Sequence, residues 1–182
     1  EPAVGCEQFR RTYAPGPLTI EPLANHDVER DLVVDLEPFM EKLASVEPYL
    51  HPDVTGSPEP GNLQTPAEMA RYSQYAACIN CMLCYAACPQ VGLATDFLGP
   101  AAITAAVRYN KDSRDYGSGD RLPLIDNSDG LWPCTFVGAC STACPKGVDP
   151  AAAIQQAKFA TTMSWAAEFV MPHHGASGGD RT

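Results

Sequence analysis

The sequence predicts a mainly α-helical fold, and three observations support this prediction. First, 45% of the 182 residues are hydrophobic, which is enough apolar material for a globular core. Second, several segments begin with residues that initiate helices and continue with apolar residues three and four positions apart. Third, only one short segment has the pattern of a β-strand, so a large sheet is not expected within the chain.

Residues 1–34 are predicted to be the C-terminal remnant of a separate domain. Residues 17–23 have the pattern of one short strand, and no hairpin partner for it is evident in the chain. A single strand leaves its backbone edges unpaired, so its sheet is expected to lie in sequence that is not present. The second domain, at 35–182, is predicted to be α-helical.

The α-helical domain is expected to begin at Asp35, whose carboxylate can cap the first helix. The apolar face of this helix is expected to consist of Leu36, Phe39, Met40 and Leu43. A loop rich in Pro and Gly is predicted at 51–64. Thr65 and Glu68 then form a capping box with Pro66 at the first helical position, and this helix should run toward the cysteine-rich part of the chain.

The remaining elements follow from proline positions and apolar spacing. A helix is predicted over 100–110, and the polar stretch 112–129 is predicted to be a loop or irregular segment. The longest helix should span 151–170 and end before Pro172. The tail at 173–182 is expected to be frayed, so its two histidines, His173 and His174, are interpreted as tail residues and not as metal ligands.

The charge balance excludes one class of partner. The formal net charge is −10 and the pI is about 4.7, whereas a nucleic-acid-binding surface needs a surplus of Lys and Arg. The longest apolar stretch, Tyr75 to Cys88, is interrupted by Asn80 and is too short to span a bilayer. No secretory signal is predicted either, because no basic segment precedes an apolar one near Glu1.

Seven of the eight cysteines form two runs with the same spacing. The first run is Cys78, Cys81, Cys84 and Cys88, followed by Pro89. The second run is Cys134, Cys140 and Cys144, followed by Pro145, with Val137 at the position that corresponds to Cys81 of the first run. Cysteines this close together are typical of metal ligands and not of a disulfide framework. The spacing is that of bacterial ferredoxins with two iron–sulfur clusters, and a four-cysteine zinc site is the alternative.

The spacing also predicts which cysteines bind which cluster. In this motif the first three positions of a run wrap one cluster, and the fourth cysteine, held extended by the following proline, ligates the other. The predicted ligands of a [4Fe-4S] cluster are therefore Cys78, Cys81, Cys84 and Cys144. The predicted ligands of the other cluster are Cys88, Cys134 and Cys140. Because Val137 provides no thiolate, this three-cysteine set favours [3Fe-4S].

The sequence around both runs resembles the iron–sulfur subunit of succinate dehydrogenase and fumarate reductase. The resemblance extends over nearly the whole chain, including 29–35 and 99–104. It implies an N-terminal β-grasp domain of the plant-type ferredoxin kind, in which Cys6 matches the last of four [2Fe-2S] ligands. Taken alone, Cys6 would be an ordinary buried or free cysteine. The other three ligands would lie upstream, so we expect the chain to be a fragment, with [2Fe-2S] only in the full-length protein.

Two features favour the fumarate reductase branch. Succinate dehydrogenases typically carry a tryptophan pair where this chain has Gln90 and Val91, and often a histidine in place of Thr135. The resemblance then implies the electron-relay subunit of a membrane-associated fumarate reductase. It would pass electrons from menaquinol to a flavoprotein (FAD) subunit that reduces fumarate to succinate, with no substrate chemistry in this chain. The alternatives are a succinate dehydrogenase subunit working from succinate to quinone, or a free carrier with two clusters.

The resemblance also implies a quinone pocket beside the [3Fe-4S] cluster. Thr135, Gln155 and Lys158 match positions that line this pocket, and Trp132 is a further candidate that could instead pack against the cluster loop. Gln155 and Lys158 are three residues apart, so they can share one helix face. Without the resemblance, Lys158 would be interpreted as a solvated helix lysine. The complex is expected to lie peripherally on the cytoplasmic face of the membrane, attached through membrane-anchor subunits.

Overall fold

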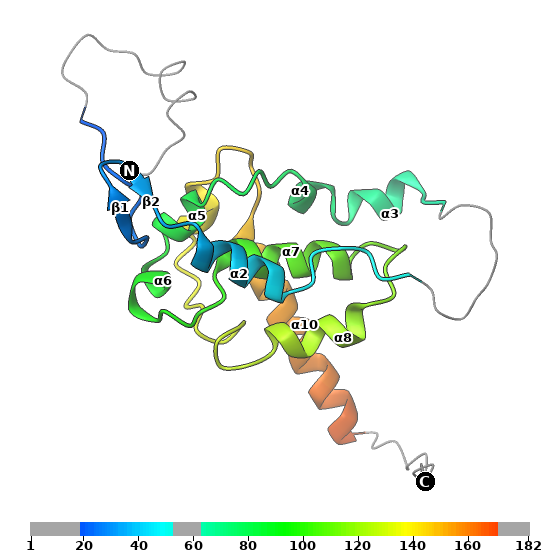
Figure 1. The fold of residues 1–182 in the computed structure, drawn as a ribbon. Helices are drawn as coiled ribbons and strands as arrows, with labels where there is room; N and C mark the ends of the chain where they lie inside the picture. Colours follow the sequence, from blue (N-terminus) through cyan, green and yellow to red (C-terminus); the bar gives the residue numbers. More distant parts are fainter. Residues whose placement is uncertain (1–18, 53–62, 171–182) are drawn as a thin grey trace, which may run out of the picture.

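The computed structural model describes residues 19–52 and 63–170, and it is mostly helical, as predicted (Figure 1). A two-stranded antiparallel sheet precedes the helices and consists of β1 (Val28–Arg30) and β2 (Val33–Val34). The helices are α2 (Glu37–Ser45), α3 (Pro66–Ala70), α4 (Ser73–Ala76), α5 (Leu83–Ala86), α6 (Pro89–Leu93), α7 (Pro100–Asn110), α8 (Ser118–Ile125), α9 (Ala139–Thr142) and α10 (Pro150–Val170). None of the helices in the described ranges combines the length and the apolar composition needed to cross a bilayer.

Helix α7 lies at the centre of the core, where it contacts α2, α4, α5, α8 and α10 (Figure 1). Its alanines, including the fully buried Ala102 and Ala106, allow the neighbouring helices to approach closely, and Ala153 of α10 is equally buried. Gly99 precedes α7 with φ +86°, and a Cβ there would overlap the buried ring of Tyr85. This close packing fixes α5, which follows the first cysteine loop, against α7.

The helix starts predicted from capping residues are confirmed. The side chains and backbone of Thr65 and Glu68 form the reciprocal capping box, with Pro66 at the first helical position. Helices also begin at Pro100 and at Pro150, and the latter continues to Val170 at the edge of the described residues. The helix from Pro66 is interrupted after five residues, and α4 begins after the break.

Helix α2 confirms half of the predicted apolar face, and its N-cap is Leu36, one residue after the predicted capping residue Asp35. The Asp35 carboxylate accepts a hydrogen bond from the backbone N–H of Glu37 at 2.9 Å, which satisfies one free donor of the first turn. Phe39 and Leu43 are buried, whereas the other two residues of the predicted face are half-exposed, Leu36 and Met40.

The β-structure differs from the prediction. Residues 19–23 of the predicted strand have no regular structure, and positions 17 and 18 lie outside the described residues. The hairpin lies later, where Val28 pairs with Val34 around a turn at Asp31 (φ +54°). Its strands are only two or three residues long and mostly exposed, so they carry no alternating apolar pattern. The described part of the predicted strand at 17–23 is therefore not a strand, and two short strands occur at 28–34, where none was predicted.

The prediction of a loop at 112–129 was also wrong, because this polar stretch contains α8. Arg121 of α8 is fully buried, and its guanidinium donates to both carboxylate oxygens of Asp115 at 3.0 Å. It also donates to Asn110 Oδ1 at 2.6 Å and to the backbone carbonyls of Glu47 and Tyr49. These long-range hydrogen bonds stabilise α8 through tertiary structure, which apolar periodicity does not report.

Candidate iron–sulfur centre

The two cysteine loops repeat the same backbone conformation. The residue two positions after the first cysteine has φ > 0 in both, at Asn80 (φ +53°) and Phe136 (φ +59°). The residue four positions after it does so again, at Met82 (φ +61°) and Gly138 (φ +79°). A four-residue helix follows in each case, α5 or α9. Residue 137 therefore occupies the same place in its loop as Cys81 does in the first loop.

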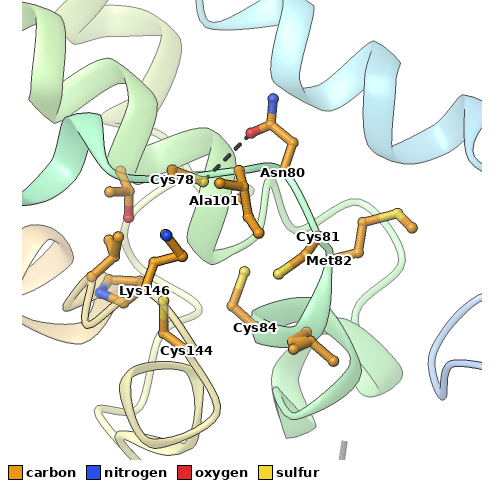
Figure 2. A pocket seen from close by; sticks show the side chains of 13 residues that line it. Cys78, Asn80, Cys81, Met82, Cys84, Ala101, Cys144 and Lys146 are labelled. Carbon is orange, nitrogen blue, oxygen red and sulfur yellow. Dashed lines mark hydrogen bonds between the residues drawn. The ribbon is translucent and has the colours of Figure 1, made fainter. Parts of the chain in front are cut away.

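The first loop surrounds a cavity with cysteines from both runs. The thiols of Cys78, Cys81 and Cys84 line it together with that of Cys144, which comes from the end of the second run (Figure 2). The thiols lie around the wall of the cavity and do not converge on a single point. The cavity is otherwise mostly apolar, with Lys146 at its edge.

The electrostatics of this cavity reflect the crowding of thiols. Burial raises the pKa of Cys84, and the neighbouring thiols, Cys144 among them, raise it further. Burial likewise raises the pKa of Cys78, whose thiol donates a hydrogen bond to Asn80 Oδ1 at 3.4 Å. Thiolates clustered in this way need a cation to compensate their charge, and bound iron would supply it.

The second cavity contains the other three clustered cysteines. Cys88 comes from the end of the first run, where its backbone is extended (φ −86°, ψ 117°) as the following proline predicts, and it joins Cys134 and Cys140. Burial raises the pKa of Cys140 to about 11, and the thiols of Cys88 and Cys134 contribute to this rise. Val137 lines the same cavity with 64% of its surface exposed. Four of the clustered cysteines thus line the first cavity and three line the second.

Both donor sets fit iron–sulfur clusters. The residues that line the two cavities supply sulfur ligands, four in one and three in the other, and include no histidine or carboxylate. Soft thiolate sets of this kind suit iron–sulfur clusters. The first cavity would hold its cluster with three cysteines of the first loop and Cys144, and the second cavity with two cysteines of the second loop and Cys88.

The residues predicted for the quinone pocket meet beside Cys134. The Lys158 ammonium donates to the backbone carbonyl of Cys134 at 2.7 Å and lies 5.7 Å from the centre of the Trp132 ring. The Gln155 amide points at the Cys134 sulfur, with 3.9 Å between Nε2 and Sγ. Thr135 follows in the loop and lines the second cavity. Lys158 is therefore held against the cluster loop, unlike a lysine that extends freely into solvent.

Several neighbours of this group were not identified from the sequence. The Trp165 ring stacks on Trp132, with 5.7 Å between the ring centres, and Gln90 Nε2 donates to Thr135 Oγ1 at 3.4 Å. Trp165 lies seven residues after Lys158, two helical turns along the same face, which is a signal that could have identified it. Nothing in the sequence connects Gln90 with Thr135. Cys6 and the two tail histidines lie outside the described residues.

Large apolar side chains are exposed on the second cysteine loop and on α10, and two of them, Phe136 and Val137, line the second cavity. The six residues, each at least 40% exposed, are Trp132, Phe136, Val137, Phe159, Met163 and Trp165. The C-terminal half of α10, which carries Met163 and Trp165, extends beyond the other helices (Figure 1). We call these six residues the aromatic surface.

A helical fold with two cysteine-lined cavities defines an iron–sulfur protein with two cluster sites. Residues 74–148 match the family model described as a 4Fe-4S dicluster domain. The fumarate reductase iron–sulfur subunit of Haemophilus influenzae is 48% identical and covers 94% of this chain and 71% of its own length. That of Mycobacterium tuberculosis is 50% identical, with 96% and 71% covered. The chain belongs to the family of iron–sulfur subunits of fumarate reductase and succinate dehydrogenase.

Further comparisons agree with this assignment. The fumarate reductase iron–sulfur subunit of Escherichia coli O157:H7 is 54% identical over 86% of this chain, and the chain spans 64% of that subunit's length. The succinate dehydrogenase iron–sulfur subunit of Paracoccus denitrificans is 37% identical over 79% of this chain and 55% of its own length. A chain of the solved Mycobacterium smegmatis Sdh1 complex has the same fold, with a TM-score of 0.70 at 23% identity over 79% of this chain and 61% of that chain.

Proposed function

We propose that this chain is the electron-relay part of a membrane-associated fumarate reductase. The seven clustered cysteines would hold [4Fe-4S] and [3Fe-4S] in the two sets described above. When bound, such clusters supply one-electron carriers inside a protein that itself performs no substrate chemistry. The full-length protein would add [2Fe-2S] through Cys6, and the relay would connect menaquinol with a flavoprotein (FAD) subunit that reduces fumarate to succinate.

The observation that carries this proposal is the exchange of cysteines between the two loops. Cys88 lies in the cavity of the second loop, and Cys144 lies in the cavity of the first. The two sites also adjoin, because α5, which carries Cys84, contacts α9, which carries Cys140. Electron transfer between carriers requires them to be close, rigidly held and shielded from water, and a shared helical core provides this arrangement.

The residues around Cys134 support a quinone site next to the three-cysteine cavity. A quinone needs hydrogen-bond donors at its carbonyl oxygens as charge develops there. The Gln155 amide, the Thr135 hydroxyl and the Lys158 ammonium are such donors. Since an ammonium has three N–H groups, Lys158 can hold the Cys134 carbonyl and still donate to a ligand.

The aromatic surface supports membrane-anchor subunits as partners. Large exposed apolar residues mark an interaction site where they lie together, as the stacked Trp132 and Trp165 do beside Lys158, and tryptophans are favoured where one side of a contact is apolar and the other is wet. This surface adjoins the proposed quinone site, so a single docking event would bring an anchor and its quinone to the cavity of Cys88, Cys134 and Cys140. We place the complex peripherally on the cytoplasmic face of the membrane.

Succinate dehydrogenase is the second candidate. Subunits with that name are 34–39% identical to this chain, compared with 48–54% for the fumarate reductase subunits. Gln90 and Thr135, where succinate dehydrogenases typically carry tryptophan and often histidine, point the same way. A free carrier with two clusters is disfavoured, because the similarity to the subunits extends well outside the cysteine runs.

Metal and sulfide analysis tests the cluster assignment. After anaerobic reconstitution, the 182-residue chain should bind four irons in one cluster and three in the other. Electron paramagnetic resonance should show the three-iron cluster in the oxidised state and the four-iron cluster in the reduced state. Two four-iron clusters, or stoichiometric zinc, would contradict the proposal.

A further inference from the structure

The side chain of Asn25 binds the backbone that carries Cys88. Its amide nitrogen donates to the carbonyl of Tyr85 at 2.9 Å, to that of Ala86 at 3.3 Å and to that of Cys88 itself at 3.0 Å. Tyr85 and Ala86 form the end of α5, where the Tyr85 carbonyl also accepts a hydrogen bond from the backbone N–H of Cys88 at 3.1 Å. One amide from the N-terminal part of the chain therefore caps α5 and holds the residue that leaves it.

The surroundings of Asn25 are built to accept this side chain. Asn25 has φ +61°, a conformation that asparagine adopts more readily than most residues. Gly92 of α6 makes room for the amide, because a Cβ at residue 92 would lie 2.6 Å from Asn25 Oδ1. Next to it, the His26 ring stacks on Tyr85, with 6.3 Å between the ring centres. The contact is thus specific in backbone conformation, in shape and in hydrogen bonding.

In the second cysteine run, the carbonyl of the fourth cysteine is held by a neighbouring backbone group and not by a distant side chain. There, the carbonyl of Cys144 accepts a hydrogen bond from the backbone N–H of Gly147 at 3.4 Å, where the chain turns back with φ +68°. At the equivalent place in the first run, the chain continues into α6 and a distant side chain reaches the carbonyl of Cys88. Of the two fourth cysteines, Cys88 is the one whose carbonyl is held by a residue far away in sequence.

We propose that Asn25 is a positioning residue for Cys88 and hence for the three-iron cluster, a role that rests on the cluster assignment proposed above. A hydrogen bond to the carbonyl of Cys88 restrains the backbone from which its thiolate extends. Because Cys88 serves the second cavity, Asn25 acts on the cluster proposed to lie next to the quinone, although the cysteine that it holds belongs to the first run. None of the three hydrogen bonds of this amide goes to a ligand of the four-cysteine cavity, although two of them go to the end of α5, the helix that carries Cys84.

The test compares Asn25→Asp with Asn127→Asp in the native complex, purified with the subunits that accompany this chain. Asp has the shape of Asn but presents oxygens to the carbonyls where Asn25 presents N–H groups. Asn127 is a matched control, because its amide donates to the carbonyls of Pro123 and Leu124 near the end of α8 and to no cysteine. Asn25→Gly is a second variant, which tolerates the positive φ and removes the donors without adding charge.

Loss of the two cluster signals to an iron chelator is followed by electron paramagnetic resonance. The three-iron signal of Asn25→Asp and Asn25→Gly should decay about 10–100-fold faster than in the wild type, the usual effect of removing a group that orients a metal ligand. The four-iron signal, and both signals of Asn127→Asp, should decay at the wild-type rate.

Three results would overturn the role of Asn25. The first is that both cluster signals of the Asn25 variants decay equally fast, and the second is that the three-iron signal of Asn25→Gly decays at the wild-type rate. The third is that the three-iron signal of Asn127→Asp decays as fast as that of Asn25→Asp. A wild-type complex without any three-iron signal would instead refute the cluster assignment, and this role with it.

Discussion

Replacing Val137 by cysteine should convert the three-iron cluster into a four-iron cluster. The flanking residues, Phe136 and Gly138, repeat the positive φ angles of Asn80 and Met82, which flank Cys81. A thiolate at residue 137 would therefore leave the backbone in the direction that Cys81 takes in the first loop. Val137 already lines the cavity of Cys88, Cys134 and Cys140, so the new ligand needs no rearrangement of the fold.

Val137→Cys should change the metal content of the protein while leaving its stability almost unchanged. Val137 is 64% exposed and contributes little to the core, so the substitution should change the free energy of unfolding by no more than about 0.5 kcal/mol. The second cluster should gain one iron, because a fourth thiolate completes the ligand set of [4Fe-4S]. Its reduction potential should fall, in keeping with the dependence of potential on cluster type.

Iron analysis and electron paramagnetic resonance of the reconstituted Val137→Cys variant check this prediction. The three-iron signal of the oxidised protein should disappear, and a second four-iron signal should appear on reduction. Val137→Ala is the matched control, because it changes the side chain without adding a ligand and should keep the three-iron signal. If the three-iron signal of Val137→Cys is unchanged, residue 137 is not the missing ligand position and the alignment of the two loops is wrong.

Two further predictions concern the quinone site and the core. Lys158→Ala in the full complex should lower quinol-driven fumarate reduction roughly ten- to hundredfold, because it removes a charge-assisted hydrogen bond of about 1.5–3 kcal/mol. Fumarate reduction driven by an artificial dye should persist. Equal loss of both activities would mean that Lys158 has a structural role. Asp112→Asn should destabilise the fold by about 3 kcal/mol in denaturant unfolding, because the fully covered Asp112 carboxylate pairs with Arg108 and Arg114. The hydrogen bonds from Arg114 lower the pKa of Asp112 to about 2, so this stabilisation should be complete above pH 4 and lost toward pH 2. If the difference in the free energy of unfolding between wild type and variant does not shrink as the pH falls, the carboxylate does not have this role.

The parts of the fold that the sequence predicts correctly are those determined by local chemistry. Thr65 and Glu68 satisfy each other's backbone donors whatever surrounds them, and proline at the start of α7 or α10 fits only the first turn of a helix. The spacing of the cysteines is local only in part, because the loop conformation fixes the first three positions of each run, whereas Cys88 and Cys144 each join the cavity of the other run. Such features can be recognised from a few neighbouring residues.

The parts that the sequence does not predict depend on distant partners. Helix α8 has a polar sequence, and what holds it is a buried arginine that bonds residues more than seventy positions away. The hairpin at 28–34 is too short and too exposed to produce a periodic pattern. The contacts of Gln90 with Thr135 and of Asn25 with Cys88 likewise join segments that are far apart in the chain. No local rule connects these residues before the chain is folded.

Paired ligand substitutions test the central claim, the exchange of cysteines between the two loops, most directly. Cys88→Ser and Cys144→Ser should each be compared with the wild type by electron paramagnetic resonance after reconstitution. The account predicts that Cys88→Ser, in the first run, disturbs the three-iron signal, and that Cys144→Ser, in the second run, disturbs the four-iron signal. If each substitution instead disturbs the cluster of its own run, the ligands do not cross and the proposed arrangement of the two clusters is wrong.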